Sequence, residues 1–113
     1  MVTEYCSGGE LFEYVRSNNR MTERTIATIM KQILSGVKYM HQKHIVHRDL
    51  KPENIVMEYR NSARRASVSS STHMSGSKGD IPPIKIIDFG TAVELEPGKF
   101  LVQKVGSPYY VAP

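Results

Sequence analysis

The sequence predicts an α+β fold of one small domain, with its elements in the order strand, helices, small strands and loop. Two segments near the start are helix-like, and the longer one repeats apolar residues at intervals of three and four. Short isoleucine-rich runs with the length of strands follow, at Ile45–Val46, Ile55–Met57 and Ile84–Ile87. A chain of 113 residues is long enough to form one such domain.

The first residues predict a strand end and a short helix. The segment Met1–Tyr5 is typical of the end of a strand, and the Ser-Gly-Gly run after Cys6 interrupts it. The segment Glu10–Val15 then predicts a short helix that ends before Asn18.

The longer helix is expected to begin at Thr22 and to fade near Gln42–Lys43. Thr22 is a suitable N-cap, and Glu23 places negative charge in the first turn, where the helix dipole favours it. Because its apolar residues share one broad face, that face has to be buried against other elements. The face consists of Ile26, Ile29, Met30, Ile33, Leu34, Val37 and Met40.

Two segments predict loops. Residues 58–83 are dominated by serine, glycine, arginine and lysine, and they cannot bury enough apolar surface to offset the entropy lost on ordering. We therefore expect a disordered Ser/Arg-rich insertion at residues 58–83. Residues 91–113, which contain Pro-Gly and Gly-Ser-Pro, are expected to form an extended loop.

The composition bears on partners and location. The formal net charge is +4, but the basic residues of the long helix fall on its polar side, and basic and aromatic residues do not interleave, so no nucleic-acid partner is expected. No apolar run reaches the ~20 residues that a bilayer span needs, so no membrane partner is expected. The single cysteine, Cys6, excludes an internal disulfide. With no secretory signal at the start, we expect a cytoplasmic or nuclear location, and the oligomeric state stays open.

The motif HRDLKPEN, followed later by DFG, carries the chemistry of this chain. A carboxylate on a loop, here Asp49, can accept the proton of an attacking hydroxyl and hold that hydroxyl in line with phosphorus. Lys51 can neutralise charge on the transferred group, and Arg48 can pair with a phosphate on another loop. Asn54 and Asp88 offer one neutral and one charged oxygen ligand, which suits Mg²⁺ beside phosphate oxygens and waters. The joint pattern predicts phosphoryl transfer from a metal nucleotide.

With these motifs, the chain resembles a eukaryotic serine/threonine protein kinase from the hinge to just short of the Ala-Pro-Glu motif. Residues 1–10 (MVTEYCSGGE) are similar to the hinge strand, and residues 105–113 (VGSPYYVAP) are similar to the end of the activation segment. The sequences EYCSGGELFEYV and VGSPYYVAP are most similar to those of the calcium- and calmodulin-regulated group, which includes calcium-dependent protein kinases. The resemblance implies a partial protein-kinase-like fold over residues 1–113, with the hinge and the upper part of the mainly helical C-lobe and without the N-lobe.

The resemblance implies ATP and Mg²⁺ as cofactors and a protein as substrate. Asp49 would accept the proton, Lys51 would contact the γ-phosphate, and Asn54 and Asp88 would bind Mg²⁺. Ser107 would support Asp49 and Lys51 near the substrate hydroxyl. The adenine pocket would be formed by Thr3 as gatekeeper, by the backbone groups of Glu4 and Cys6, and by Val56 as its floor, while His47 and Phe89 would stack in the hydrophobic column that links the lobes.

Glu10 and Glu53 match family positions at which acidic residues read arginine upstream of the acceptor. Two carboxylates near the peptide groove would favour basic substrates. In the other interpretation, Glu10 contacts only the ribose and Glu53 is solvated.

One departure from the family is the connection between Asn54 and Asp88, which is roughly twenty residues longer than the usual hairpin. It contains the sequence RRASV, in which two arginines precede Ser67. This resembles a site for basic-directed kinases, so Ser67 is either a regulatory phosphorylation site or part of an inert spacer.

A second departure from the family is the absence of three of its sequence features. It has no Gly-x-Gly-x-x-Gly loop, no Val-Ala-x-Lys strand and no preceding helix with a partner glutamate. It also ends before the helices that cover the long helix in the family, so the seven apolar residues of that face would be exposed to water. We therefore expect the chain alone to be poorly folded and inactive, and the alternative function is a truncated, non-catalytic binding or regulatory protein derived from a kinase.

Three histidines, His41, His44 and His47, are spaced by three residues and suggest a metal site. His41 ends a helix and His44 lies in a turn, so the three need not share a face, and zinc is not expected.

Overall fold

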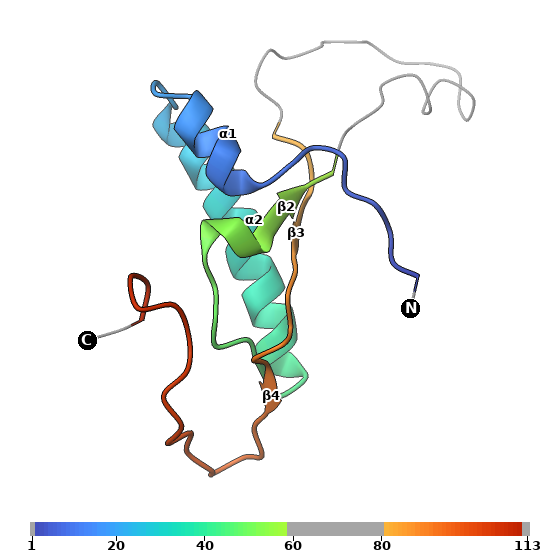
Figure 1. Cartoon of the computed structure of the whole chain (residues 1–113), viewed down its shortest axis with the longest axis vertical. Coiled ribbons are helices and arrows are strands. Elements are labelled where there is room, and N and C mark those ends of the chain that lie inside the picture. The colour runs from blue at the N-terminus through green and yellow to red at the C-terminus, as the bar shows by residue number, and fades with distance from the viewer. Residues whose placement is uncertain (1, 59–80, 112–113) are drawn as a thin grey trace.

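The computed structural model describes residues 2–58 and 81–111 of the chain and has a mixed helix-and-strand architecture (Figure 1). Two helices, two short antiparallel strand pairs and one turn of 3-10 helix form in the described part. Their bounds are α1 Leu11–Ser17, α2 Glu23–Gln42, β1 Ile45–Val46, the 3-10 turn Pro52–Asn54, β2 Ile55–Met57, β3 Ile84–Ile86 and β4 Val93–Glu94. The predicted α+β fold is confirmed at this level, and most of the predicted insertion (residues 58–83) lies outside the described residues.

The long helix α2 lies at the centre of the fold, as Figure 1 shows. Its predicted start and end are confirmed. The Thr22 hydroxyl accepts a hydrogen bond from the backbone N–H of Thr25 at 3.2 Å, so Thr22 is the N-cap. The helix ends at Gln42, and His44 just beyond it has a left-handed backbone with φ of 58°.

The β2–β3 hairpin packs along α2 and supplies the strand half of the core. Its register pairs Ile55 with Ile86 and Met57 with Ile84. Leu11 of α1, Ile29 of α2 and Ile55 of β2 form the buried core cluster, so the three elements meet at one point. Burying apolar side chains of this kind is the main term that holds such elements together.

A second contact ties the hairpin to α2 through polar groups. The Gln32 side chain donates from Nε2 to the Pro82 carbonyl at 3.3 Å and accepts from the Ile84 backbone N–H at 3.0 Å. One turn further along α2, Gly36 leaves room for the Ile86 side chain, whose Cδ1 would lie 3.0 Å from an added Cβ. Gln32 therefore fixes the place where the chain enters β3.

The N-terminal segment is extended but is not a strand over Val2–Tyr5, so the predicted strand end is wrong there. A strand needs a partner for its backbone groups, and in the described part of the chain pairing begins only at Gly8. The Gly8 N–H donates to the Met57 carbonyl at 2.9 Å, and the Met57 N–H donates to the Gly9 carbonyl at 2.8 Å. A side chain at Gly8 would collide with the Met57 carbonyl, which explains the glycine.

The segment predicted as one extended loop from residue 91 onward contains a short strand, β4. It pairs antiparallel with β1, with Ile45 opposite Glu94 and Val46 opposite Val93. The Leu95 N–H extends this pairing by donating to the His44 carbonyl at 2.7 Å. The start of the segment is thereby held beside the chain that leads into the HRDLKPEN motif.

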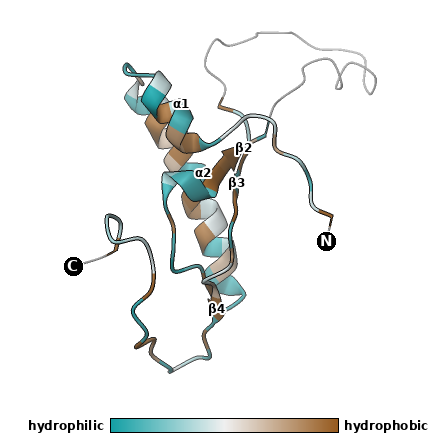
Figure 2. Cartoon of the chain, in the orientation of Figure 1, coloured by the Kyte–Doolittle hydropathy of each residue, from teal (hydrophilic) through white to brown (hydrophobic). Residues whose placement is uncertain are grey.

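The apolar face of α2 is only partly covered, and Figure 2 shows apolar residues gathered on α2 and along β2 and β3. Ile29 and Met40 are buried, and Ile33 and Val37 are half-buried, so the expectation that all seven residues face water is wrong. The strands β3 and β1 pack along α2, and Leu11 of α1 joins Ile29 in the core cluster, so more of the helix is covered than the sequence suggested. The remaining members, Ile26, Met30 and Leu34, are exposed, Leu34 by 59%.

Among the described residues, no helix combines the length and apolar character that crossing a bilayer requires.

Candidate functional site

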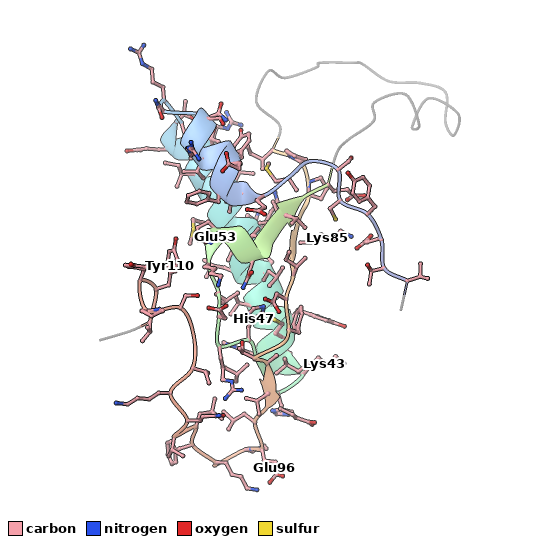
Figure 3. All side chains as sticks on the ribbon, viewed as in Figure 1. Lys43, His47, Glu53, Lys85, Glu96 and Tyr110 are labelled. Carbon is pink, nitrogen blue, oxygen red and sulfur yellow. The ribbon has the colours of Figure 1, made fainter. Side chains whose placement is uncertain are left out.

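The HRDLKPEN loop is organised around the imidazole of His47, which is 2% exposed and lies at the centre of Figure 3. Its Nδ1 accepts from the Asp49 backbone N–H at 3.3 Å, so Nε2 carries the proton and donates to the Ile87 carbonyl at 3.0 Å. The ring meets Phe89 edge-on, with 4.9 Å between the ring centroids. One buried side chain thus contacts both the catalytic-type loop and the DFG turn.

Asp49 is the centre of a polar cluster. Its Oδ2 accepts from Lys51 Nζ at 2.8 Å, and its Oδ1 accepts from the backbone N–H and the hydroxyl of Ser107 at 2.9 and 2.8 Å. Lys51 Nζ also donates to Ser107 Oγ at 2.7 Å, which closes a triangle of hydrogen bonds. Asn54 Nδ2 donates to the Asp49 carbonyl at 3.0 Å and to Oδ2 at 3.2 Å. Apart from the Lys51–Ser107 hydrogen bond, the donors of the cluster are directed at the carboxylate or the backbone carbonyl of Asp49.

These contacts set the charges of the cluster. The hydrogen bond from Lys51, followed by those from Ser107, lowers the pKa of Asp49 from its ordinary 3.8 to about 2. The carboxylate in turn raises the pKa of Lys51 above its ordinary 10.5, chiefly through the same hydrogen bond. Asp49 is therefore an anion and Lys51 a cation across the whole physiological range.

The β2–β3 hairpin brings Asn54 and Asp88 to the same end of the sheet. Asn54 directly precedes β2, and its carbonyl accepts from the Ile87 N–H at 2.9 Å, one residue before Asp88. Asp88 has a left-handed backbone with φ of 60°, and its Oδ1 accepts from the Gly90 N–H at 3.2 Å. The turn that carries Asp88 therefore follows directly on the backbone pairing of Ile87 with Asn54.

The donor set at this end fits a magnesium ion. Asn54 uses its Nδ2 for Asp49, its Oδ1 makes no hydrogen bond to another described residue, and Asp88 is exposed. Mg²⁺ takes few protein oxygens and fills the rest of its shell with phosphate oxygens and waters. His41, His44 and His47 do not come together: within residues 2–58 and 81–111, no group of three or more His, Cys, Asp or Glu side chains is placed to hold a metal.

The residues predicted for the adenine pocket lie along one edge of the molecule and are only partly brought together. Glu10 lies opposite Val56 in a single antiparallel bridge, and Val56 is half-buried. Thr3 and Glu4 are exposed in the extended N-terminal segment, where Glu4 forms an ion pair of 2.7 Å with Lys85 of β3. The second side of a nucleotide pocket is absent from the described part of the chain.

Glu53 is held by the C-terminal segment (Figure 3). The Tyr110 hydroxyl donates to Glu53 Oε1 at 3.3 Å, while Oε2 is buried and has no hydrogen-bond partner among the described residues. Tyr110 has its pKa raised, first by burial and then by the Glu53 charge. The expectation that Glu53 is merely solvated does not describe this environment.

A contact that sequence reasoning missed joins the HRD arginine to the activation-type segment. Arg48 donates from Nε to the Thr91 carbonyl and from Nη1 to Gln103 Oε1, the latter at 3.2 Å. The Thr91 hydroxyl donates to the His47 carbonyl at 3.0 Å. Nothing in the sequence marked Gln103, because a lone glutamine in an extended segment has no distinguishing pattern.

A groove of about 600 Å³ opens beside Asp49, between the loop and the C-terminal segment. Its walls include Arg48, Leu50, Gln103, Ser107 and Tyr110. The groove therefore places a polar floor, which contains the ionised Asp49, next to a partly apolar wall.

Comparison with known proteins places the sequence in a family. The sequence matches the protein kinase domain family over residues 1–113. It is 43% identical over 113 residues to calcium-dependent protein kinase 4 of Plasmodium berghei (strain Anka) and equally to calcium-dependent protein kinase 4 of Plasmodium falciparum (isolate 3D7). The alignments cover 100% of this chain and 18% of each relative, so the chain spans less than a fifth of their length. The chain belongs to the protein kinase domain family.

Proposed function

We propose that this chain carries the catalytic loop, the metal-binding turn and the end of the activation segment of a serine/threonine protein kinase. The reaction is transfer of the γ-phosphoryl group of ATP to Ser or Thr hydroxyls of proteins. The observation that carries the proposal is the hydrogen bonding of the Asp49 carboxylate. It accepts from Lys51 Nζ at 2.8 Å and from the backbone N–H and hydroxyl of Ser107 at 2.9 and 2.8 Å, and Lys51 Nζ also donates to Ser107 Oγ at 2.7 Å.

In this proposal Asp49 orients the substrate hydroxyl and takes its proton. With a pKa of about 2, the carboxylate is a weak base in the resting state, so its first task is to align the hydroxyl. It takes the proton once bond formation has made that hydroxyl acidic. Lys51, which stays charged, neutralises the oxygens of the transferred group.

Asn54 and Asp88 would hold Mg²⁺, because they are the oxygen donors at the site end of the hairpin. When bound, the magnesium–ATP complex supplies the phosphoryl group and part of the charge neutralisation. The backbone of Glu4 and Cys6, with Val56 and Thr3, would line the adenine side. This assignment makes the chain the hinge and upper C-lobe, to which an N-lobe in the same kinase would add the second wall.

The substrate in this proposal has basic residues before its acceptor. Glu53 supports this because its Oε2 is buried and has no hydrogen-bond partner within residues 2–58 and 81–111, while Tyr110 donates to its Oε1. A guanidinium supplies the donors that such a carboxylate lacks. Glu10, exposed at the far side, would contribute through ribose contact or as a second acidic group.

The test uses a host kinase, which we define as Plasmodium berghei calcium-dependent protein kinase 4 with its matching segment replaced by this chain. Phosphoryl transfer by the host kinase to a basic Ser peptide is expected, and Asp49→Asn should abolish it. Lys51→Arg is the matched variant that keeps the charge. A fully active Asp49→Asn host kinase would contradict the proposal.

The same experiment separates the alternative, a truncated non-catalytic product that acts by binding. In that case the host kinase would bind peptide or partner but transfer no phosphate, and Asp49→Asn would change nothing. The isolated 113-residue chain serves as a reference, for which we expect no transfer.

A further inference from the structure

Arg48 is the one side chain of the HRD loop that contacts the activation segment at both of its ends. It donates to the Thr91 carbonyl at the start and to Gln103 Oε1 near the finish. Its backbone has a left-handed φ of 70°. A guanidinium with five donors in a fixed plane suits such a bridging role.

The finish of the segment also approaches the loop closely through its backbone. Gly106 has φ of 113°, and a Cβ there would lie 2.8 Å from the Arg48 carbonyl oxygen. The next residue, Ser107, donates twice to Asp49. The Gln103 contact therefore lies four residues before the Ser107 contacts, on the same stretch of chain.

The segment between these ends holds no side chain that a protein kinase could phosphorylate. Residues 92–106 read AVELEPGKFLVQKVG and include no serine, threonine or tyrosine. The hydroxyls that flank this stretch are already engaged, Thr91 with the His47 carbonyl and Ser107 with Asp49. Residues 92–106 therefore cannot gain a phosphate on a hydroxyl that would face Arg48 and order the segment.

We infer that Gln103 is a positioning residue that takes the place of a phosphate: its amide oxygen accepts from Arg48 and holds Ser107 against Asp49 without modification of the segment. The inference rests on the proposed kinase function, because its consequence is read out at Asp49. An uncharged acceptor gives a weaker bond than a phosphate does, but it is present at all times. The segment is therefore ordered constitutively.

The test compares three variants of the host kinase. Gln103→Ala removes the acceptor, Gln103→Glu replaces it with a charged one, and Val102→Ala is the control, since Val102 is 92% exposed. Hydrogen exchange of the Ser107 amide reports how often the segment leaves Asp49. We expect Gln103→Ala to raise that exchange by about three- to tenfold, as befits loss of one partly exposed charged hydrogen bond.

Kinetics of the host kinase supply the second measurement. Gln103→Ala should lower kcat about three- to tenfold with little change in KM for ATP. Gln103→Glu should keep both the kcat and the slow Ser107 exchange of the parent host kinase. Val102→Ala should match the parent. Unchanged Ser107 exchange and kcat in Gln103→Ala, or a Gln103→Glu variant as impaired as Gln103→Ala, would overturn the inference.

The two proposals fail in different ways. If Asp49→Asn leaves transfer intact, the proposed function is wrong, yet Gln103→Ala would still loosen the Ser107 amide. If Asp49→Asn abolishes transfer and Gln103→Ala changes neither measurement, only the role of Gln103 is wrong.

Discussion

Ser107 is bonded to Asp49 through two donors on one oxygen, its backbone N–H at 2.9 Å and its hydroxyl at 2.8 Å. Only the hydroxyl can be removed by substitution. The same oxygen of Ser107 accepts from Lys51 at 2.7 Å, so the hydroxyl serves both charged groups. The backbone bond fixes the position of Asp49, and the hydroxyl sets its charge environment.

Ser107→Ala in the host kinase should lower kcat by about 10- to 100-fold, the effect of losing one hydrogen bond to a charged group. Ser107→Thr keeps the hydroxyl and should stay within a few-fold of the parent. Steady-state transfer to a Ser peptide is the measurement. If alanine and threonine variants were equally active, the hydroxyl would have no part in the site.

The ionisation of Asp49 gives a pH prediction. Its pKa is about 2 in the folded chain and 3.8 ordinarily, so its contribution to stability is complete above pH ~4 and is lost as the pH falls through about 2. Lys51→Met removes the main cause, and the pKa should rise toward the ordinary value. Carbon-13 NMR titration of the aspartate carboxyl groups in the host kinase checks this.

The control for this titration is Lys99→Met, which breaks an exposed ion pair with Glu96 far from the site. It should leave the Asp49 midpoint where it is. A wild-type midpoint near the ordinary aspartate value would show that Lys51 and Ser107 do not hold the carboxylate as described.

Gly106→Ala should separate Ser107 from Asp49, because the added Cβ would meet the Arg48 carbonyl at 2.8 Å. Gly98→Ala is the matched control: Gly98 also has a positive φ, of 82°, but nothing lies within 4 Å of its Cβ position. Both variants carry the backbone strain of a left-handed residue, roughly 1 kcal/mol. Only Gly106→Ala should lose phosphoryl transfer in the host kinase, and equal losses in the two would contradict the close approach.

His47→Leu should destabilise the fold by about 1–3 kcal/mol, because it leaves the Ile87 carbonyl and the Asp49 N–H without their partner in a buried place. Leucine keeps most of the volume, so the effect reports the hydrogen bonds more than a cavity. Urea unfolding of the host kinase provides the free energy. His41→Leu, on the exposed end of α2, is the matched control and should stay within about 0.5 kcal/mol.

Local patterns predicted most of the fold. The helix from Glu23 to Gln42 follows from its apolar spacing and from the Thr22 cap, both of which are readable within a few residues. The strands β2 and β3 follow from isoleucine-rich runs. The strand end expected at Met1–Tyr5 failed over its described part, Val2–Tyr5, because strand formation depends on a partner. The strand β4 was missed because two residues carry no pattern of their own.

The site divides in the same way. The motifs predicted Asp49, Lys51, Asn54, Asp88 and Ser107. The structure brings all of these except Asp88 into contact, and Asp88 follows Ile87, whose N–H pairs with the Asn54 carbonyl. The contacts of Arg48 with Gln103 and of Tyr110 with Glu53 span more than fifty residues of sequence, and only the folded chain reveals them. Side-chain pairs of this kind depend on how loops pass one another, which no local period encodes. The roles of these residues, and the phosphorylation of Ser67 outside the described residues, stay predictions.

The short β2–β3 hairpin separates the site residues at one of its ends from the connecting sequence at the other. Asn54 and Ile87 are paired at its site end, and Glu58 donates to the Pro83 carbonyl at 2.8 Å at its other end, where Gln32 also fastens the chain. Doubling the length of a connection beyond that point costs only about 0.6 kcal/mol of closure entropy. Residues gained or lost there leave the spacing of Asn54 and Asp88 untouched, so accessory sequence and catalytic geometry can vary independently in this chain.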